Sequence, residues 1–309
     1  MNELETIGWQ REPGSPELNF GAPIRRALVH RSAISEVFIT DIDHHSANHV
    51  LMGAQWPRWH VFYGANLAGT DSALMAETLR QAVIALSHTR GVPLNHQFLL
   101  PHMDITVTNP RLDGSRPAEV SVELTIRQIQ GSSGIPSQLD VDARFVVAGT
   151  EIGQGNASAR ILGAAAYERY RSRRAPADAL ETTTQTGLLE PYIVGHHSIR
   201  NVLLGSLLGS QRWPLVVDQT HPIFFDHPLD HVPGMLLIEA SRQALRASYG
   251  VPHADFSQFS ADFFHIVEFG QDIEVVVPSS GVEPNRVAVE VIQGDRVVVG
   301  LKGLLTAAT

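Results

Sequence analysis

Apolar residues recur at helical spacing in two distant segments of the chain. The first segment runs from about Thr70 to Gly91, and the second from Pro233 to Gly250. Their apolar positions return every three or four residues, which is typical of a helix with a buried face. The first helix is predicted to begin near Thr70-Asp71-Ser72, which supplies good capping residues. Both helices are expected to stop at the same tripeptide, Gly-Val-Pro.

Much of the remaining chain alternates between apolar and polar residues, as half-buried antiparallel strands do. The clearest case is residues 120–126, where Val120, Val122, Leu124 and Ile126 alternate with Ser121, Glu123 and Thr125. Before the first helix we expect a strand at 37–40 and then a long loop that holds Asp41, Asp43, His44, His45, Trp56 and Trp59. Further strands are predicted at 145–147, 159–162, 201–204, 273–277, 287–292 and 297–301.

The two predicted helices share a polar motif. Glu77-Thr-Leu-Arg80-Gln81-Ala82 matches Glu239-Ala-Ser-Arg242-Gln243-Ala244 at four of six positions. In each copy the Glu, Arg and Gln stand at i, i+3 and i+4, so all three project from one helix face. Burying such groups is costly unless they meet partners or a substrate. The recurrence predicts a duplicated domain with a site built around this helix.

The order of elements predicts an α+β fold made of two repeats. One helix followed by several antiparallel strands occurs twice, which indicates two antiparallel sheets, each wrapped around a central helix. We interpret this as a tandem (double) hot-dog fold with its sheets joined side by side. Two ferredoxin-like or unrelated α+β domains are the alternative. The repeats are expected at residues 15–170 and 188–309, and the polar segment 171–187 is expected to connect them.

Composition limits the class of protein. The chain has 309 residues, of which 43% are hydrophobic, enough for two ordinary cores, and its net charge is −9. This acidity argues against a nucleic-acid partner, because no basic stripe is available to neutralise phosphates. No apolar run is long enough to span a membrane, and the N-terminus is acidic rather than signal-like. We therefore expect a soluble, cytoplasmic protein with no nucleic-acid or membrane partner.

The start of the second helix carries the strongest candidate chemistry. Pro233-Gly234 opens this helix, so the N–H groups of Gly234 and Met235 have no helical partner. Together with the positive end of the helix dipole, they are suited to bind an oxyanion or a thioester carbonyl. Glu239 follows about one and a half turns later. It is placed to act as a general base if burial raises its pKa.

Less specific roles remain open for the same residues. Glu239 and Arg242 can form an i, i+3 ion pair that serves structure alone, and this alternative is stronger for Glu77 and Arg80. His227 either caps the loop before the second helix or orients a substrate. Because the chain has no cysteine, it can form no disulfide or thiolate metal site. We expect no metal and no cofactor, although His227 and His231 each follow an aspartate.

The segment from His227 to Gln243 is similar to the active-site segment of hot-dog β-hydroxyacyl-carrier-protein dehydratases. It differs from theirs by two fewer residues between the His and the Pro-Gly, and by Arg242 before the Gln. The complete pattern resembles the AfsA-like, A-factor-type γ-butyrolactone biosynthesis enzymes of actinomycetes. The resemblance includes Val29-His30-Arg31 and the two Glu-x-x-Arg-Gln helices, and extends from about Leu28 to the C-terminus.

This resemblance implies an acyltransferase on the way to a butenolide or related signalling molecule. A β-ketoacyl group would pass from an acyl-carrier-protein or coenzyme A thioester to the hydroxyl of dihydroxyacetone phosphate. Because the chain has no Gly-x-Ser-x-Gly elbow, the alcohol is expected to attack the thioester directly. The expected catalytic residues are Gly234, Glu239 as base, Glu77 and His227. The expected substrate-binding residues are Arg242, as a fork for the phosphate, Gln243, Met235, His231 and Arg80.

Two other functions are kept as alternatives. A hot-dog dehydratase or thioesterase would act on the same thioesters, but it has no evident need for Arg242. A non-catalytic acyl-thioester binding protein would use only the tunnel of the fold. The sequence leaves open the acyl chain, the carrier of the donor and the choice between monomer and homodimer. It also leaves open whether one half or both hold a working site.

Overall fold

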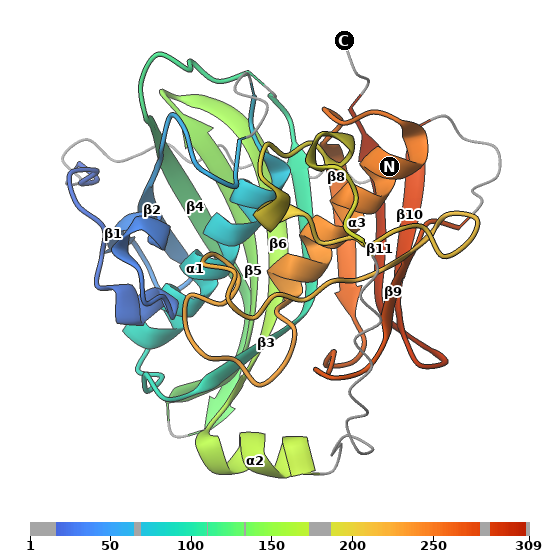
Figure 1. The fold of residues 1–309 in the computed structure, drawn as a ribbon. Coiled ribbons are helices and arrows are strands. Elements are labelled where there is room, and N and C mark those ends of the chain that lie inside the picture. Colours follow the sequence, from blue (N-terminus) through green and yellow to red (C-terminus); the bar gives the residue numbers. More distant parts are fainter. Residues whose placement is uncertain are drawn as a thin grey trace, which may run out of the picture.

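One antiparallel sheet of 11 strands forms the body of the protein (Figure 1). The computed structural model describes residues 17–64, 69–109, 111–132, 134–172, 187–278 and 285–306. No helix among these residues is both long and apolar enough to cross a membrane. The strands are β1 (Ile39–His44), β2 (His49–Trp56), β3 (Gln97–Val107), β4 (Ala118–Ser132), β5 (Ile135–Val147), β6 (Thr150–Leu162), β7 (Arg212–Pro214), β8 (Phe256–Phe263), β9 (Ile273–Val276), β10 (Arg286–Gln293) and β11 (Arg296–Leu305).

The sheet consists of two halves with the same strand order. Its full order is β1-β2-β4-β5-β6-β3-β8-β11-β10-β9-β7, so β2-β4-β5-β6-β3 on one side corresponds to β7-β9-β10-β11-β8 on the other. The halves meet where β3 pairs with β8, between His102↔Asp262 and Thr106↔Gln258. Helix α1 (Ser72–Thr89) precedes β3, and α3 (Gly234–Tyr249) precedes β8. The predicted α+β class and the side-by-side joining of two repeated sheets are confirmed.

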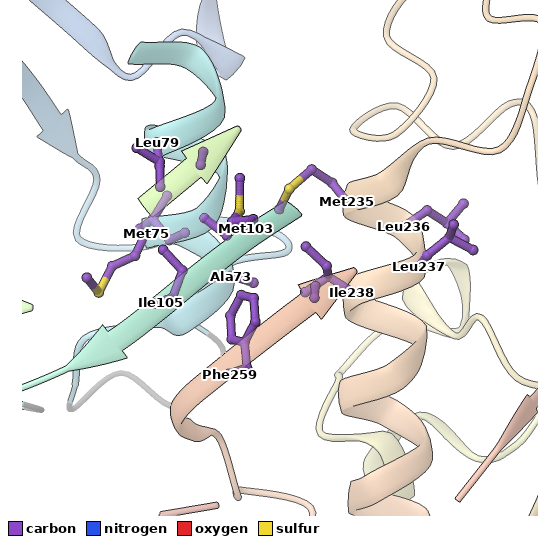
Figure 2. Packing of buried hydrophobic residues seen from close by; sticks show 14 of the residues in the cluster. Ala73, Met75, Leu79, Met103, Ile105, Met235, Leu236, Leu237, Ile238 and Phe259 are labelled. Carbon is purple, nitrogen blue, oxygen red and sulfur yellow. The ribbon is translucent and has the colours of Figure 1, made fainter. Parts of the chain in front are cut away.

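The helices begin where the sequence predicts. Asp71 caps α1 by accepting hydrogen bonds from the N–H groups of Ala73 and Leu74, whereas Pro233 precedes α3 and offers no side-chain cap. Both helices lie in the same hydrophobic core (Figure 2). In that view Met235, at the start of α3, extends toward Met103 on β3. Because α1 is buried around nearly its whole circumference, Glu77 and Gln81 of its shared motif are buried as well, whereas Arg80 is partly exposed.

Two expectations about the segments before the helices are wrong. The predicted loop after residue 40 is a hairpin, in which Ile42 pairs with Met52. The acids and histidines before its second strand obscured that strand, in which residues 50–54 are buried without a break rather than alternately. Conversely, residues 201–204 form no strand: a 3₁₀ turn ends at Asn201, and Leu204 makes only an isolated bridge with Leu215.

The predicted connection at 171–187 falls mostly outside the described residues, as do the first 16 residues. Helix α2 (Ala164–Ser172) follows β6 and extends into the start of that predicted connection. The repeat boundaries at 170 and 188 therefore stay a prediction. The remaining short elements are 3₁₀ helices at Arg26–Val29, Ile34–Glu36 and Pro191–Val194.

Candidate active site

A cavity of about 390 Å³ opens where the start of α3 meets residues of the first half. Its walls combine an apolar part with a cluster of cationic and imidazole side chains. The apolar part includes Ile84, Phe98, Leu99, Met103 and Ile238, and the polar part includes His30, Arg31, Arg80, Arg160, His227, His231 and His265. Such a mostly apolar pocket with a few convergent polar groups is the usual form of a small-molecule site.

The N-terminus of α3 forms one wall of this cavity. Gly234 and Met235 both line it, and the backbone N–H of Leu236 already donates to the carbonyl of Pro233 at 3.0 Å. Among the described residues, the structure records no acceptor for the N–H groups of Gly234 and Met235. Glycine suits this position because a Cβ there would lie 3.0 Å from Cε1 of Phe263. Two free donors at the positive end of a helix therefore face the cavity.

Glu77 lies behind the cavity and holds two of its arginines. Its carboxylate accepts hydrogen bonds from Arg31 at 2.7 Å, Arg80 at 2.8 Å and Gln81 at 2.7 Å. Burial alone would raise the pKa of Glu77, but the two guanidinium groups and the amide lower it to about 2. The glutamate is thus ionised at neutral pH, and it fixes the arginines that line the cavity.

His227 is paired with an aspartate that is itself well anchored. Its Nδ1 lies 2.5 Å from Asp226, whose carboxylate also accepts from the backbone N–H groups of Ser32 at 2.8 Å and Ala33 at 3.3 Å. Burial opposes ionisation of Asp226, yet His227, Arg31 and these N–H groups lower its pKa. A charged acceptor at Nδ1 favours the tautomer in which Nε2 is the proton acceptor. His231 is arranged similarly, with Nδ1 2.7 Å from Asp230.

Glu239 and Arg242 lie outside this cavity, in a buried cluster of charges. Glu239 accepts from His196 at 2.8 Å and from Arg242 at 2.7 Å. Arg242 also donates through Nη1 to Asp71 at 3.0 Å and to Asp255 at 3.3 Å. Burial acts to raise the pKa of Glu239. The guanidinium group of Arg242, the hydrogen bond with His196 and the guanidinium group of Arg246 outweigh burial, so the net shift of the pKa is downward.

The two glutamines support the chain that precedes each helix. Gln81 accepts from the N–H of Phe38 at 2.9 Å and donates to the carbonyl of Glu36 at 2.7 Å. Gln243 does the same with Leu203 at 2.9 Å and Asn201 at 2.8 Å. The matching contacts place the Glu, Arg and Gln of the two halves at equivalent positions. They also explain the missing strand at 201–204, because the N–H of Leu203 bonds to a side chain.

The structure therefore separates the predicted site residues into two groups. Gly234, Met235, His227, His231 and Arg80 line the cavity, and Glu77 directly supports it. Glu239, Arg242 and Gln243 contact one another instead, and line no part of it.

Sequence reasoning assigned no site role to His30, Arg31 or Asp226. The sequence signal that could have found His30 and Arg31 is a second repeated segment, in which Val29-His30-Arg31 corresponds to Val194-Gly195-His196. Both triplets follow a 3₁₀ turn, and His30 and Gly195 both adopt a left-handed conformation there. Burial and the nearby His88, Arg80 and His227 lower the pKa of His30 to about 4, so it is neutral at pH 7. Within the described residues, no group of three or more potential ligands is arranged to hold a metal ion.

Comparison with known proteins shows the family of the chain. The sequence model of the A-factor biosynthesis hotdog domain matches residues 15–163 and again 178–307. Two relatives are each named 2-oxo-3-(phosphooxy)propyl 3-oxoalkanoate synthase. The one from Streptomyces virginiae is 33% identical, covering 72% of this chain and 76% of its own; that from Streptomyces coelicolor is 34% identical, with 72% and 71% covered. A third relative of the same name, from Streptomyces griseus, is 28% identical over 87% of this chain and 90% of its own.

Solved structures with the same arrangement of elements are hot-dog proteins. An acyl-ACP thioesterase from Bacteroides thetaiotaomicron has a TM-score of 0.52 and 13% identity, and covers 83% of this chain and 98% of its own. The 12:0-ACP thioesterase from Umbellularia californica has a TM-score of 0.51 and 9% identity, with 83% and 97% covered. At such low identity the likeness concerns the fold alone, and it confirms the predicted hot-dog fold.

Proposed function

The chain belongs to the A-factor biosynthesis hotdog family, and we propose that it is an acyltransferase that joins a 3-oxoacyl group to dihydroxyacetone phosphate. The product named in its relatives, 2-oxo-3-(phosphooxy)propyl 3-oxoalkanoate, is the ester of those two parts. The observation that carries the proposal is the cavity, because it brings an uncapped helix N-terminus, cations and an apolar wall together in one space.

Each part of the cavity has a task in such a transfer. The acyl chain lies against the apolar wall around Ile84, Phe98 and Met103. The thioester carbonyl accepts hydrogen bonds from the N–H groups of Gly234 and Met235, which stabilise the negative charge that develops on its oxygen. The phosphate of the acceptor lies near the positively charged part of the cavity. A 3-oxoacyl thioester of an acyl carrier protein or of coenzyme A serves as the donor.

We assign the general base to His227 rather than to Glu239. His227 lines the cavity, and Asp226 fixes its tautomer so that Nε2 can accept the proton of the attacking hydroxyl. Glu239 is fully buried outside the cavity, and its low pKa makes it a weak proton acceptor. The role of Glu239 as base remains a sequence-based prediction, and the substitution of Glu239 described below tests it.

The experiment mixes the purified protein with a 3-oxoacyl thioester and dihydroxyacetone phosphate, and follows the products by mass spectrometry. We expect the phosphorylated ester to form only when both substrates are present, and parallel reactions with acyl-carrier-protein and coenzyme A thioesters identify the donor. Free 3-oxo acid in place of ester would indicate a thioesterase. Consumption of a 3-hydroxyacyl thioester with loss of water would indicate a dehydratase.

Substitution of the two candidate bases separates their roles. His227→Gln should lower kcat about 10²- to 10⁴-fold, the usual contribution of a general base. His265→Gln is the matched control, because this imidazole also lines the cavity but is exposed. Glu239→Gln should retain turnover in the fraction that folds. Loss of turnover in folded Glu239→Gln, with normal activity of His227→Gln, would restore the sequence-based assignment.

A further inference from the structure

The two halves of the protein treat equivalent helix N-termini in opposite ways. When α1 and α3 are aligned on their shared motif, Asp71 is equivalent to Pro233, Ser72 to Gly234, and Arg80 to Arg242. The start of α1 is closed by side chains of the protein, and we call it the closed copy. The start of α3 faces the cavity, and we call it the open copy.

The closed copy shows what this arrangement binds. Oδ1 of Asp71 accepts hydrogen bonds from the N–H groups of Ala73 at 2.8 Å and Leu74 at 3.0 Å. The same oxygen accepts from Nη1 of Arg242 at 3.0 Å. One anionic oxygen is thus held between a helix N-terminus and the guanidinium of the opposite half. Asp255 completes the closure by accepting from the N–H of Ser72 at 3.0 Å.

The open copy has three corresponding donors without the carboxylates. The N–H groups of Gly234 and Met235 correspond to those of Ser72 and Ala73, which bind Asp255 and Asp71, whereas the N–H of Leu236, the counterpart of Leu74, donates to the carbonyl of Pro233. Arg80 binds Glu77 through Nε and Nη2, each at 2.8 Å, as Arg242 binds Glu239 through Nε and Nη2, each at 2.7 Å. This leaves Nη1 of Arg80, the counterpart of the atom that holds Asp71. The structure records no partner for that atom among the described residues, and Arg80 lines the same cavity as Gly234 and Met235. Pro233, in the place of Asp71, has no side-chain acceptor to offer.

We propose that Nη1 of Arg80 and the N–H groups of Gly234 and Met235 together bind an anionic oxygen of the substrate, in the place that the carboxylates of Asp71 and Asp255 occupy in the closed copy. This inference rests on the proposed acyl transfer and adds a catalytic residue to it. The oxygen is that of the tetrahedral intermediate, because it must lie within reach of the helix N–H groups that polarise the thioester carbonyl. The chain therefore has one working site, and the Asp71–Arg242 cluster is its permanently closed counterpart.

The proposed acyl transfer needs no reactant besides the thioester and the acceptor alcohol. The acceptor hydroxyl oxygen forms a bond to the carbonyl carbon while its proton passes to the base. The electron pair of the C=O π bond moves to the carbonyl oxygen, which Arg80 and the two N–H groups then hold as an anion. When the C=O bond re-forms, the C–S bond breaks, and the leaving sulfur takes the proton from the base. Arg80 thus stabilises charge that is absent from the bound substrates.

The test compares Arg80→Lys and Arg80→Gln with Arg160→Gln, which removes a different, exposed cation from the same cavity. Loss of one oxyanion donor typically costs about 10²- to 10³-fold in kcat. We expect that loss in both Arg80 variants, equal for dihydroxyacetone phosphate and dihydroxyacetone, with KM for the acceptor nearly unchanged. A phosphonate mimic of the tetrahedral intermediate should bind more weakly by a similar factor, which a purely structural role of Arg80 would not produce.

Other results overturn the inference. A loss confined to the phosphorylated acceptor, and expressed in KM, would mean that Arg80 binds the phosphate instead. A loss no greater than that of Arg160→Gln would remove Arg80 from the reaction. Circular dichroism of each variant confirms folding, and Arg31 and Gln81 still satisfy Glu77 when Arg80 is changed. If the wild-type protein forms no ester at all, it is the proposed function that fails, and the binding of the phosphonate still tests the oxygen site.

Discussion

Replacing Arg242 distinguishes a structural ion cluster from the phosphate fork that the sequence predicts. The Arg242 side chain is only 2% exposed, and it is the shared partner of Glu239, Asp71 and Asp255. Asp71 caps the helix of one half, and Glu239 belongs to the helix of the other, so Arg242 joins the two halves inside the core. Arg242→Ala would leave the buried carboxylates of Asp71 and Glu239, and the partly buried one of Asp255, without their common cation.

The structure sets the size of the expected effect. Removing one partner from a buried ion pair costs about 3–5 kcal/mol, because the remaining charge stays buried and unpaired. A protein of ordinary stability, about 5–15 kcal/mol, would lose a large part of its margin. We expect the melting temperature to fall by roughly 10 °C, at about 2–4 °C for each kcal/mol. Arg242→Lys should lose less, since an ammonium group can still reach one carboxylate.

The assay combines thermal or urea unfolding with steady-state kinetics at a temperature where each variant is folded. For both acceptors, kcat and KM should stay close to the wild-type values, because Arg242 lines no part of the cavity. The reasoning would be refuted by a variant of normal stability that loses about 10- to 150-fold with dihydroxyacetone phosphate alone. A loss of that size is expected for one charge-assisted contact to a phosphate.

Two further changes test Glu77, which supports the cavity, and Gly195, which precedes the His196 partner of Glu239. Glu77 has a pKa of about 2 in the folded protein against 4.5 ordinarily, so its stabilising contribution is present above about pH 4.5 and is lost as the pH falls toward 2. Urea unfolding at a series of pH values should show wild-type stability falling by about 3 kcal/mol more than that of Glu77→Gln over this range, and parallel curves would contradict the prediction. Gly195→Ala should destabilise by several kcal/mol, because the residue has a φ of +76° and a Cβ there would collide with the carbonyl of Pro252. Gly250→Ala, with a φ of +64° and open space around it, is the control and should cost only about 1–2 kcal/mol by thermal unfolding.

The sequence by itself determined the elements whose pattern is local. Capping at Asp71, the Pro233-Gly234 start and the helical spacing defined both helices, and strict alternation defined the strand around 120–126. The shared Glu-x-x-Arg-Gln motif was sufficient to predict the repeat, because equivalent buried polar groups need equivalent partners. The resemblance that this motif supports also led to the family.

Tertiary structure decided how the repeats join and which copy of the motif is open. Strands β3 and β8 were not predicted, although their pairing builds the seam, because Pro101 and mixed polarity mask their alternation. The sequence shows two nearly identical motifs and favours the second as the site. Whether an arginine faces a cavity or a carboxylate depends on the residue opposite it in the other half. Arg242 binds Asp71, whereas Arg80 lines the cavity together with Pro233, the counterpart of Asp71, and only the folded chain brings these distant positions together.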